Sequence, residues 1–182
     1  YTVHFDANGG SGEMEDQPMV YDTPRRLEAG GVTRKGYIFR GWNTSKDPAA
    51  GTGFDDRAMI DENNQDELAP DEDGGTATLY ALWEPIVYGI DYDLGVGALP
   101  EGRNNPVTYT VEDSFSLVNP EAGDYAFTGW TGTGLDKPAV KVTIGKGSAG
   151  DRSYKANWKL KEFRVTFETG GGSRVADQTV TI

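Results

Sequence analysis

The stretch YIFRGW at residues 37–42 decides how this chain is interpreted, because it occurs again as YAFTGW at residues 125–130. A second block, LYALW at residues 79–83, has its counterpart in YKANW at residues 154–158. All four tryptophans of the chain lie in these blocks. Two blocks that recur in the same order and hold every tryptophan indicate a duplicated unit rather than chance similarity.

The opening strand of this unit occurs three times, as YTVHF at residues 1–5, YGIDY at 88–92 and FRVTF at 163–167. A unit of roughly 75–85 residues is longer than the solenoid repeats of about 20–50 residues, so each complete copy should form its own small domain. The sequence therefore predicts a first module at 1–85, a diverged second module at 86–160 and the truncated start of a third module at 161–182.

Residues in each opening stretch alternate in polarity, which predicts a half-buried strand with Val3 and Phe5 facing the core. Asn8–Gly12 then supplies residues that accept positive φ, so a hairpin should follow, with Met19–Tyr21 as its return strand. A short helical turn is expected over Arg25–Ala29. The 25 glycines and 9 prolines favour many turns. The predicted fold is mostly β, α+β at most, with short strands, long loops and little helix.

The closing block has one face that is preserved between the copies and one that is not. The preserved face carries Leu79, Ala81 and Trp83 in the first copy and Tyr154, Ala156 and Trp158 in the second. The other face changes from Tyr80 and Leu82 to Lys155 and Asn157. We therefore expect the preserved face to be core and the changing face to meet solvent.

The recurring aromatic residues have two interpretations. Trp42, Trp130, Tyr37 and Tyr125 could stack on a carbohydrate, or they could form the centre of each module. A set of aromatic rings that recurs in a small module is more often its core, because each ring buries about 150–250 Å². The sequence favours the core.

Composition excludes several classes of partner. The chain has 17 basic and 29 acidic residues, a formal net charge of −12, and no cysteine. Nucleic acid is not expected as a partner because phosphate binding needs a basic face. Missing cysteine rules out a thiol nucleophile and a disulfide framework. No segment has the roughly 18 apolar residues that span a bilayer, so no membrane insertion by this fragment is expected. The chain opens directly in a strand pattern without a signal peptide and is interpreted as an excised fragment.

The acidic segment Asp61–Gly75 is the first candidate site, since it holds seven carboxylates and no basic residue. Hard cations such as Ca²⁺ bind several carboxylate oxygens, but the spacing differs from that of an EF-hand loop. The second copy has no equivalent segment. A solvated, mobile insertion is the expected interpretation.

Other chemistry-bearing residues do not form a complete motif. Asp55–Asp56 and the pair Asp91 and Asp93 could supply carboxylates for glycoside hydrolysis, which needs two of them across a cleft. His4 is the single histidine and is expected on the surface. The glycines of 129–134 and 170–172 lack the lysine and helix of a phosphate-binding loop.

Lys155 and Asn157 raise the further idea of an intramolecular isopeptide bond. They lie close together in the second copy only, and Tyr80 stands where Lys155 would be in the first. Loss of one ammonia or one water from the intact mass would reveal such a bond.

The three blocks together resemble the internalin-type B-repeat, also called the Listeria–Bacteroides repeat. The first copy carries them as FDANGG at residues 5–10, GYIFRGW at 36–42 and LYALW at 79–83. The second copy departs from the pattern, with Asp124 before its YAFTGW block and YDLG at 92–95 in place of the Asn-Gly-Gly turn. The third resembles the family from Phe163 to Gly172.

This resemblance implies tandem β-grasp-like, ubiquitin-like modules on the cell surface or cell wall of a bacterium. It also implies a non-catalytic extracellular array that acts as a stalk or spacer, or in adhesion. The alternative is a glycan- or protein-binding module of a secreted or wall-anchored protein. We assign no catalytic, cofactor-binding or metal-ligating residue, and expect an unidentified protein or glycan on a host or neighbouring cell as the partner.

Overall fold

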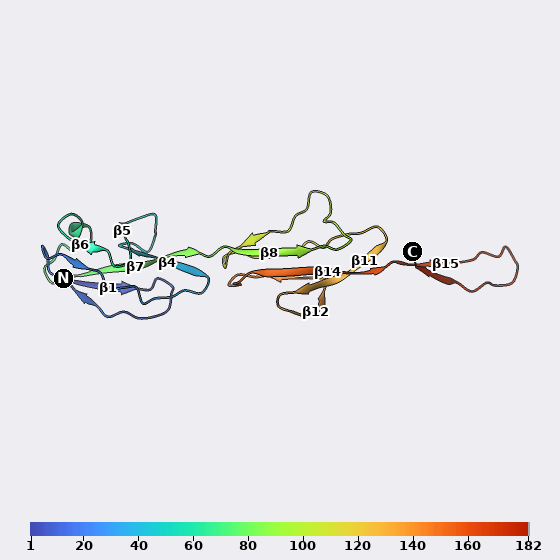
Figure 1. The fold of residues 1–182 in the computed structure, drawn as a ribbon, viewed down its shortest axis with the longest axis horizontal. Helices are drawn as coiled ribbons and strands as arrows, with labels where there is room; N and C mark the ends of the chain where they lie inside the picture. Colours follow the sequence, from blue (N-terminus) through green and yellow to red (C-terminus); the bar gives the residue numbers. More distant parts are fainter. Residues whose placement is uncertain (182) are drawn as a thin grey trace. The chain divides into compact units, whose positions relative to one another are not determined.

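The computed structural model describes residues 1–181 and divides into two compact units, Tyr1–Ile86 and Val87–Ile182. The mostly-β prediction is confirmed: within the described residues the one helical element is the three-residue 3-10 helix η1 (Gln65–Glu67). Unit 1 contains β1 (Thr2–Asp6), β2 (Gln17–Pro18), β3 (Arg25–Arg26), β4 (Tyr37–Asn43), β5 (Gly53–Phe54), β6 (Met59–Ile60) and β7 (Thr76–Pro85). Unit 2 contains β8 (Tyr88–Asp93), β9 (Thr108–Tyr109), β10 (Phe115–Ser116), β11 (Tyr125–Gly132), β12 (Leu135–Ala139), β13 (Thr143–Ile144), β14 (Arg152–Leu160), β15 (Glu162–Val165) and β16 (Gln178–Thr181) (Figure 1).

Both units contain the same five-stranded sheet. Its strand order is β2-β1-β7-β4-β5 in unit 1 and, read in the matching direction, β9-β8-β14-β11-β12 in unit 2. The strands that come first and last along the chain in each sheet are neighbours at its centre and pair in parallel: β1 with β7, and β8 with β14. The remaining pairs are antiparallel. A two-stranded sheet accompanies each, β3-β6 and β10-β13. The β-grasp-like assignment and the three-module boundaries stay predictions.

The glycine inside the repeated aromatic block creates a β-bulge. The register between β4 and β7 shifts between Phe39 and Gly41, and the same shift occurs in unit 2 between Phe127 and Gly129. Gly41 has φ +113° and Gly129 has φ +132°, a backbone conformation that L side chains rarely adopt. The bulge therefore requires glycine at this position.

Each unit has its own core, centred on the tryptophan that follows the bulge. Trp42 and Trp130 are both fully buried, as the core interpretation predicts, whereas Tyr37 and Tyr125 are only partly buried and belong to neither core. The first core also contains Val3, Phe5, Met19, Leu27, Val32, Phe54, Ile60, Leu68, Leu79 and Ala81. The second contains Ile90, Tyr109, Leu117, Val142, Ile144, Tyr154 and Ala156. On the preserved face of the closing strand, Leu79, Ala81, Tyr154 and Ala156 are buried and the two tryptophans are partly buried. On the other face Lys155 is exposed, whereas Tyr80, Leu82 and Asn157 are partly buried.

Two local predictions are wrong. The return strand is Gln17–Pro18 rather than Met19–Tyr21, because the buried Gln17 amide bonds the backbone of Arg26 and Glu28 and fixes the chain at that point. The expected helical turn over Arg25–Ala29 is instead extended: β3 pairs with β6, and Leu27 enters the core.

The acidic segment is not a solvated insertion throughout, which corrects a third prediction. Gln65 and Leu68 are buried. The Gln65 side chain donates to the Asp22 carboxylate at 2.7 Å and accepts from the Asp22 backbone N–H at 2.8 Å. The core therefore anchors this segment by one apolar and one amide side chain.

No helix within residues 1–181 combines the length and the hydrophobicity that crossing a membrane requires.

Candidate functional site

The candidate site with the largest set of chemistry-bearing side chains is a shallow cavity of about 390 Å³ in unit 2. It lies over three adjacent strands, β8, β14 and β11. Its lining residues are Asp91, Tyr92, Asp93, Thr131, Gly132, Ser153, Tyr154 and Lys155. It therefore brings together the carboxylates and the lysine that the sequence singled out.

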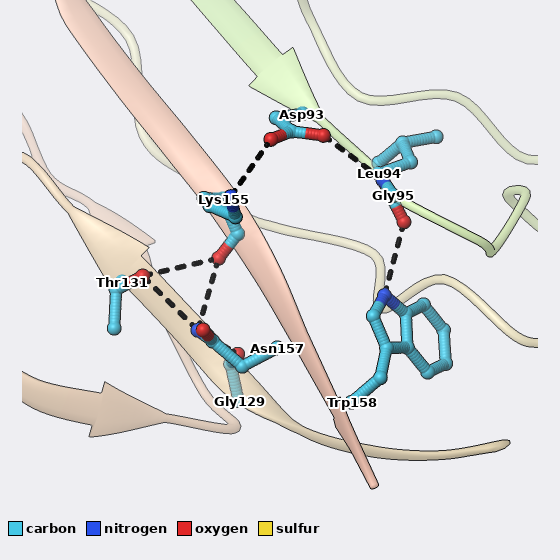
Figure 2. Close-up of polar contacts among 8 residues, drawn as sticks. All are labelled: Asp93, Leu94, Gly95, Gly129, Thr131, Lys155, Asn157 and Trp158. Carbon is cyan, nitrogen blue, oxygen red and sulfur yellow. Dashed lines mark hydrogen bonds and ion pairs between the residues drawn. The ribbon is translucent and has the colours of Figure 1, made fainter.

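Asp93 and Lys155 form an ion pair across β8 and β14, with 3.4 Å between Lys155 Nζ and Asp93 Oδ2 (Figure 2). The other Asp93 oxygen accepts the Gly95 backbone N–H at 3.0 Å. The side chains of Lys155 and Asp93 are 65% and 58% exposed. An ion pair so exposed contributes at most about 1 kcal/mol, because water screens it.

The Asn157 side chain bonds the neighbouring strand β11 rather than Lys155 Nζ. Its amide nitrogen donates to the Gly129 carbonyl and to Thr131 Oγ1, both at 3.0 Å (Figure 2). The amide therefore bridges β14 to β11 at the bulge. Lys155 instead pairs with Asp93 on β8, the strand on the other side of β14.

The isopeptide idea leads to a prediction. We expect the intact mass of the purified chain to equal its sequence mass, because Lys155 Nζ is exposed, charged and paired with a carboxylate rather than with Asn157. Mass spectrometry of the intact and the Lys155→Arg chains checks this, since the variant cannot form the bond. A deficit of one water or one ammonia in the parent alone would contradict the prediction.

The carboxylate pairs are not placed as glycoside hydrolysis requires. Asp91 and Asp93 both come from β8, on one side of the cavity, and Asp93 is paired with Lys155. Asp56 accepts the Gly30 backbone N–H at 2.7 Å, and Asp55 precedes it in a loop of unit 1. Neither pair faces its partner across a cleft, which is the geometry of that reaction.

The tyrosines beneath the cavity have structural roles. Tyr92 donates its hydroxyl hydrogen to the Pro106 carbonyl at 2.9 Å, and its ring stacks on that of Tyr154 with centroids 6.3 Å apart. Burial, followed by the charge of Tyr154, raises the pKa of the Tyr92 phenol to about 12. Tyr92 is therefore neutral and is not a proton-transfer group at ordinary pH.

The remaining candidates lie apart from this cavity. His4 is exposed, as expected, with its Nδ1 2.7 Å from Asp16 Oδ1. Across residues 1–181 no three histidine, aspartate or glutamate side chains are grouped to hold a metal ion. The buried Trp42 and Trp130 offer no ring face for a sugar.

A feature that the sequence analysis did not identify is the contact between the closing tryptophan and the opening turn. Trp83 Nε1 donates to the Ala7 carbonyl at 2.9 Å, and a Cβ on Gly10 would lie 2.5 Å from the Trp83 ring. We call this carbonyl and glycine the tryptophan socket. The sequence signal that could have revealed it is a glycine five residues after the aromatic end of the opening strand.

Unit 2 contains the same tryptophan socket. Trp158 Nε1 donates to the Leu94 carbonyl at 3.0 Å, and a side chain on Gly97 would clash with the Trp158 ring. Leu94 and Gly97 occupy the places of Ala7 and Gly10 in the turn, so the socket persists although the sequence between them changes.

The two central tryptophans differ in one hydrogen bond, which leads to a second prediction. Trp130 Nε1 donates to Asn119 Oδ1 at 2.9 Å, whereas Trp42 Nε1 is buried and has no hydrogen-bond partner among residues 1–181. Ala29 occupies the position in unit 1 that Asn119 occupies in unit 2. Each lies two residues after a leucine, Leu27 or Leu117, whose backbone N–H donates to the strand pair's other segment, at Ala58 or Val142. We expect Ala29→Asn to stabilise unit 1 by about 1 kcal/mol, because it supplies the missing acceptor.

Hydrogen exchange of unit 1 against denaturant measures this stabilisation. The matched change is Asn119→Ala, which should destabilise unit 2 by about 1–3 kcal/mol by leaving its indole N–H unpaired. Equal stability of the parent and the Ala29→Asn chain would show that the indole N–H has no net requirement for an acceptor.

Comparisons with known proteins agree with the repeat. Over 177 residues, 97% of this chain, the sequence is 31% identical to a protein of Evansella cellulosilytica described as a Gly-rich membrane protein. A second protein of that organism, described as a membrane protein, is 27% identical over 180 residues. The chain spans 18% and 24% of the lengths of these two relatives. No solved structure matches the chain. Residues 1–65 match the Listeria–Bacteroides repeat domain, so the first unit is similar to a repeat of that family.

Proposed function

We propose that this chain is a non-catalytic, load-bearing spacer in a protein on a bacterial surface. The observation that carries the proposal is the central parallel pair in each five-stranded sheet, which joins the strand that comes first in the chain to the strand that comes last in that sheet. The family match and the relatives described as membrane proteins support a surface-associated repeat protein.

The parallel pair in unit 1 determines how a pulling force acts on it. The register runs from Thr2 opposite Thr76 to Asp6 opposite Tyr80, and β7 continues to Pro85. Because the strands are parallel, the chain enters at one end of the sheet and leaves at the other. Tension between entry and exit therefore slides β1 past β7 and loads all their hydrogen bonds together, instead of breaking them one at a time.

Unit 2 repeats this geometry. Ile90 lies opposite Arg152 and Asp93 opposite Lys155, and β14 continues to Leu160. The recurrence of the same parallel pair in two units whose sequences have diverged supports a mechanical role. Among residues 1–181, Asp91 and Asp93 lie on one strand rather than across a cleft. The central tryptophans Trp42 and Trp130 are buried rather than available to a glycan.

Single-molecule stretching of the chain tests the proposal and gives a third prediction. Pulled from its two ends, the chain should show two unfolding events, each releasing about 25 nm, since an extended residue spans about 3.3–3.6 Å. Handles at residues 35 and 86 provide the matched control. They load the antiparallel β4–β7 pair at its open end, where Tyr37 lies opposite Pro85, and should unzip unit 1 at a clearly lower force.

The same force in both pulling geometries would contradict a load-bearing role for the parallel pair. A second arm tests the location. Antibodies against the chain should label intact cells of the bacterium that encodes it, and external protease should remove the label. Labelling that requires permeabilised cells would overturn the surface assignment.

A further inference from the structure

We propose that the hairpin β15–β16 is an open docking site for the closing strand of a third repeat, with a preformed tryptophan socket for that strand's indole. The inference concerns an interaction surface of this chain and does not depend on the mechanical role proposed above.

The hairpin reproduces the strand register of the first hairpin in unit 1. Val3 lies opposite Gln17, and Val165 lies opposite Gln178 in the equivalent positions of β15 and β16. The opening strands align residue by residue, since YTVHF and FRVTF start the two copies. Residues 162–181 thus have the pairing of a module's first hairpin rather than that of an arbitrary one.

The turn that follows β15 has the geometry of the tryptophan socket. In the two complete units the socket glycine donates its N–H to the socket carbonyl, from Gly10 to Ala7 at 2.9 Å and from Gly97 to Leu94 at 3.1 Å. Gly172 donates to the Thr169 carbonyl at 2.9 Å in the same way. Within the described part of the chain, a Cβ on Gly172 would approach atoms of Thr169 alone, so no described ring takes the place that Trp83 has at Gly10.

The apolar side chains of the third opening strand are exposed, unlike their counterparts in unit 1. Val165 is 39% exposed and Phe167 is 43% exposed, whereas their counterparts Val3 and Phe5 are 0% and 5% exposed. Within residues 1–181, β15 pairs with β16 alone. The counterpart β1 has a second partner, β7, on its other edge. The free edge of β15 therefore corresponds to the edge that a closing strand occupies.

The occupant follows from the two closing strands already present. Each runs parallel to the opening strand and carries a core residue, an alanine and a tryptophan on one face, as Tyr154, Ala156 and Trp158 do in β14. A strand of this pattern would cover Val165 and Phe167 and place its indole on Gly172. The long relatives, of which this chain spans 18% and 24%, have room for such a repeat.

The test extends the whole chain. A copy of residues 22–86 is appended after residue 182, so that the hairpin takes the place of β1 and β2 in a module completed by the body of unit 1. We expect amides of β15 to exchange at least about tenfold more slowly in the extended chain, because they gain a parallel partner and burial. Unchanged exchange would overturn the proposal.

Substitutions then locate the contact. In the extended chain, Gly172→Ala should abolish the added protection, because its Cβ would meet the indole. In the 182-residue chain the same change should leave exchange unaltered, since φ at Gly172 is not positive and the nearest atom is 3.2 Å away. Full protection of the Gly172→Ala extended chain would contradict the socket.

A graft into unit 1, with two substitutions, tests the same assignment if the appended copy of residues 22–86 folds poorly. In the full chain, residues 163–178 replace residues 1–17, and the rest of unit 1 keeps its own sequence. Unit 1 should stay folded, with its core amides as protected from hydrogen exchange as in the parent chain. Val165→Asp in the graft should unfold it, and Thr166→Asp, on the solvent face, should not. An unfolded graft, or equal effects of the two substitutions, would refute the assignment.

Discussion

Replacing Gly41 by alanine is expected to unfold unit 1. The added Cβ would clash with the Phe54 carbonyl oxygen, which belongs to the paired strand β5, and neither backbone can move without breaking the sheet. The φ of +113° adds strain of about 1–3 kcal/mol for any residue with a side chain. Together the two effects should remove more than about 3 kcal/mol, which is a large share of the stability of a small domain.

Gly53→Ala is the matched control for this prediction. Gly53 lies in β5 itself, its φ is not positive, and a Cβ there would find its nearest atom, the Trp42 carbonyl oxygen, at 3.9 Å. Hydrogen-exchange mass spectrometry of unit 1 compares the two variants, with unit 2 as an internal reference. Similar protection of both variants would show that the bulge accepts a side chain.

Trp130→Ala is the second substitution with a large expected effect, and it acts on unit 2. The indole is fully buried, contacts the rings of Phe127, Tyr92 and Tyr154, and bonds Asn119. Its removal leaves a cavity and should cost about 3–5 kcal/mol. Hydrogen exchange of unit 2 across a series of denaturant concentrations, with unit 1 as an internal reference, measures the loss.

Val140→Ala serves as the control, because Val140 is 60% exposed and lies in the same unit. Its effect should stay within about 0.5 kcal/mol, as for surface substitutions in general. A midpoint for Trp130→Ala equal to that of Val140→Ala would mean that unit 2 does not depend on the core described for it.

The sequence alone predicted the features that depend on repetition and alternation. Comparison of the copies identified Trp42 and Trp130 as core, and the preserved face of the closing strand as the more buried of its two faces. These features are local, since side chains in a strand alternate between its two faces whatever the rest of the chain does.

Features that depend on contacts far along the chain were not predicted. Gln17 marks the return strand because its amide reaches the backbone of Arg26 and Glu28, and no pattern within residues 17–21 reports those bonds. The tryptophan socket likewise joins Trp83 to Ala7 across the whole unit. The candidate cavity needed the sheet order, because only pairing of β8 with β14 brings Asp93 to Lys155.

The central position of the closing strand also governs how each unit folds. The centre of the sheet forms only when β1 pairs with β7, as Thr2 does with Thr76. The contacts that define the fold therefore join the two ends of the module. Proteins dominated by such distant pairings fold slowly, because the entropy of closing the loop is lost before those contacts form. During synthesis a module therefore stays open until its last strand emerges, and the copies of an array complete themselves one after another from the N-terminus.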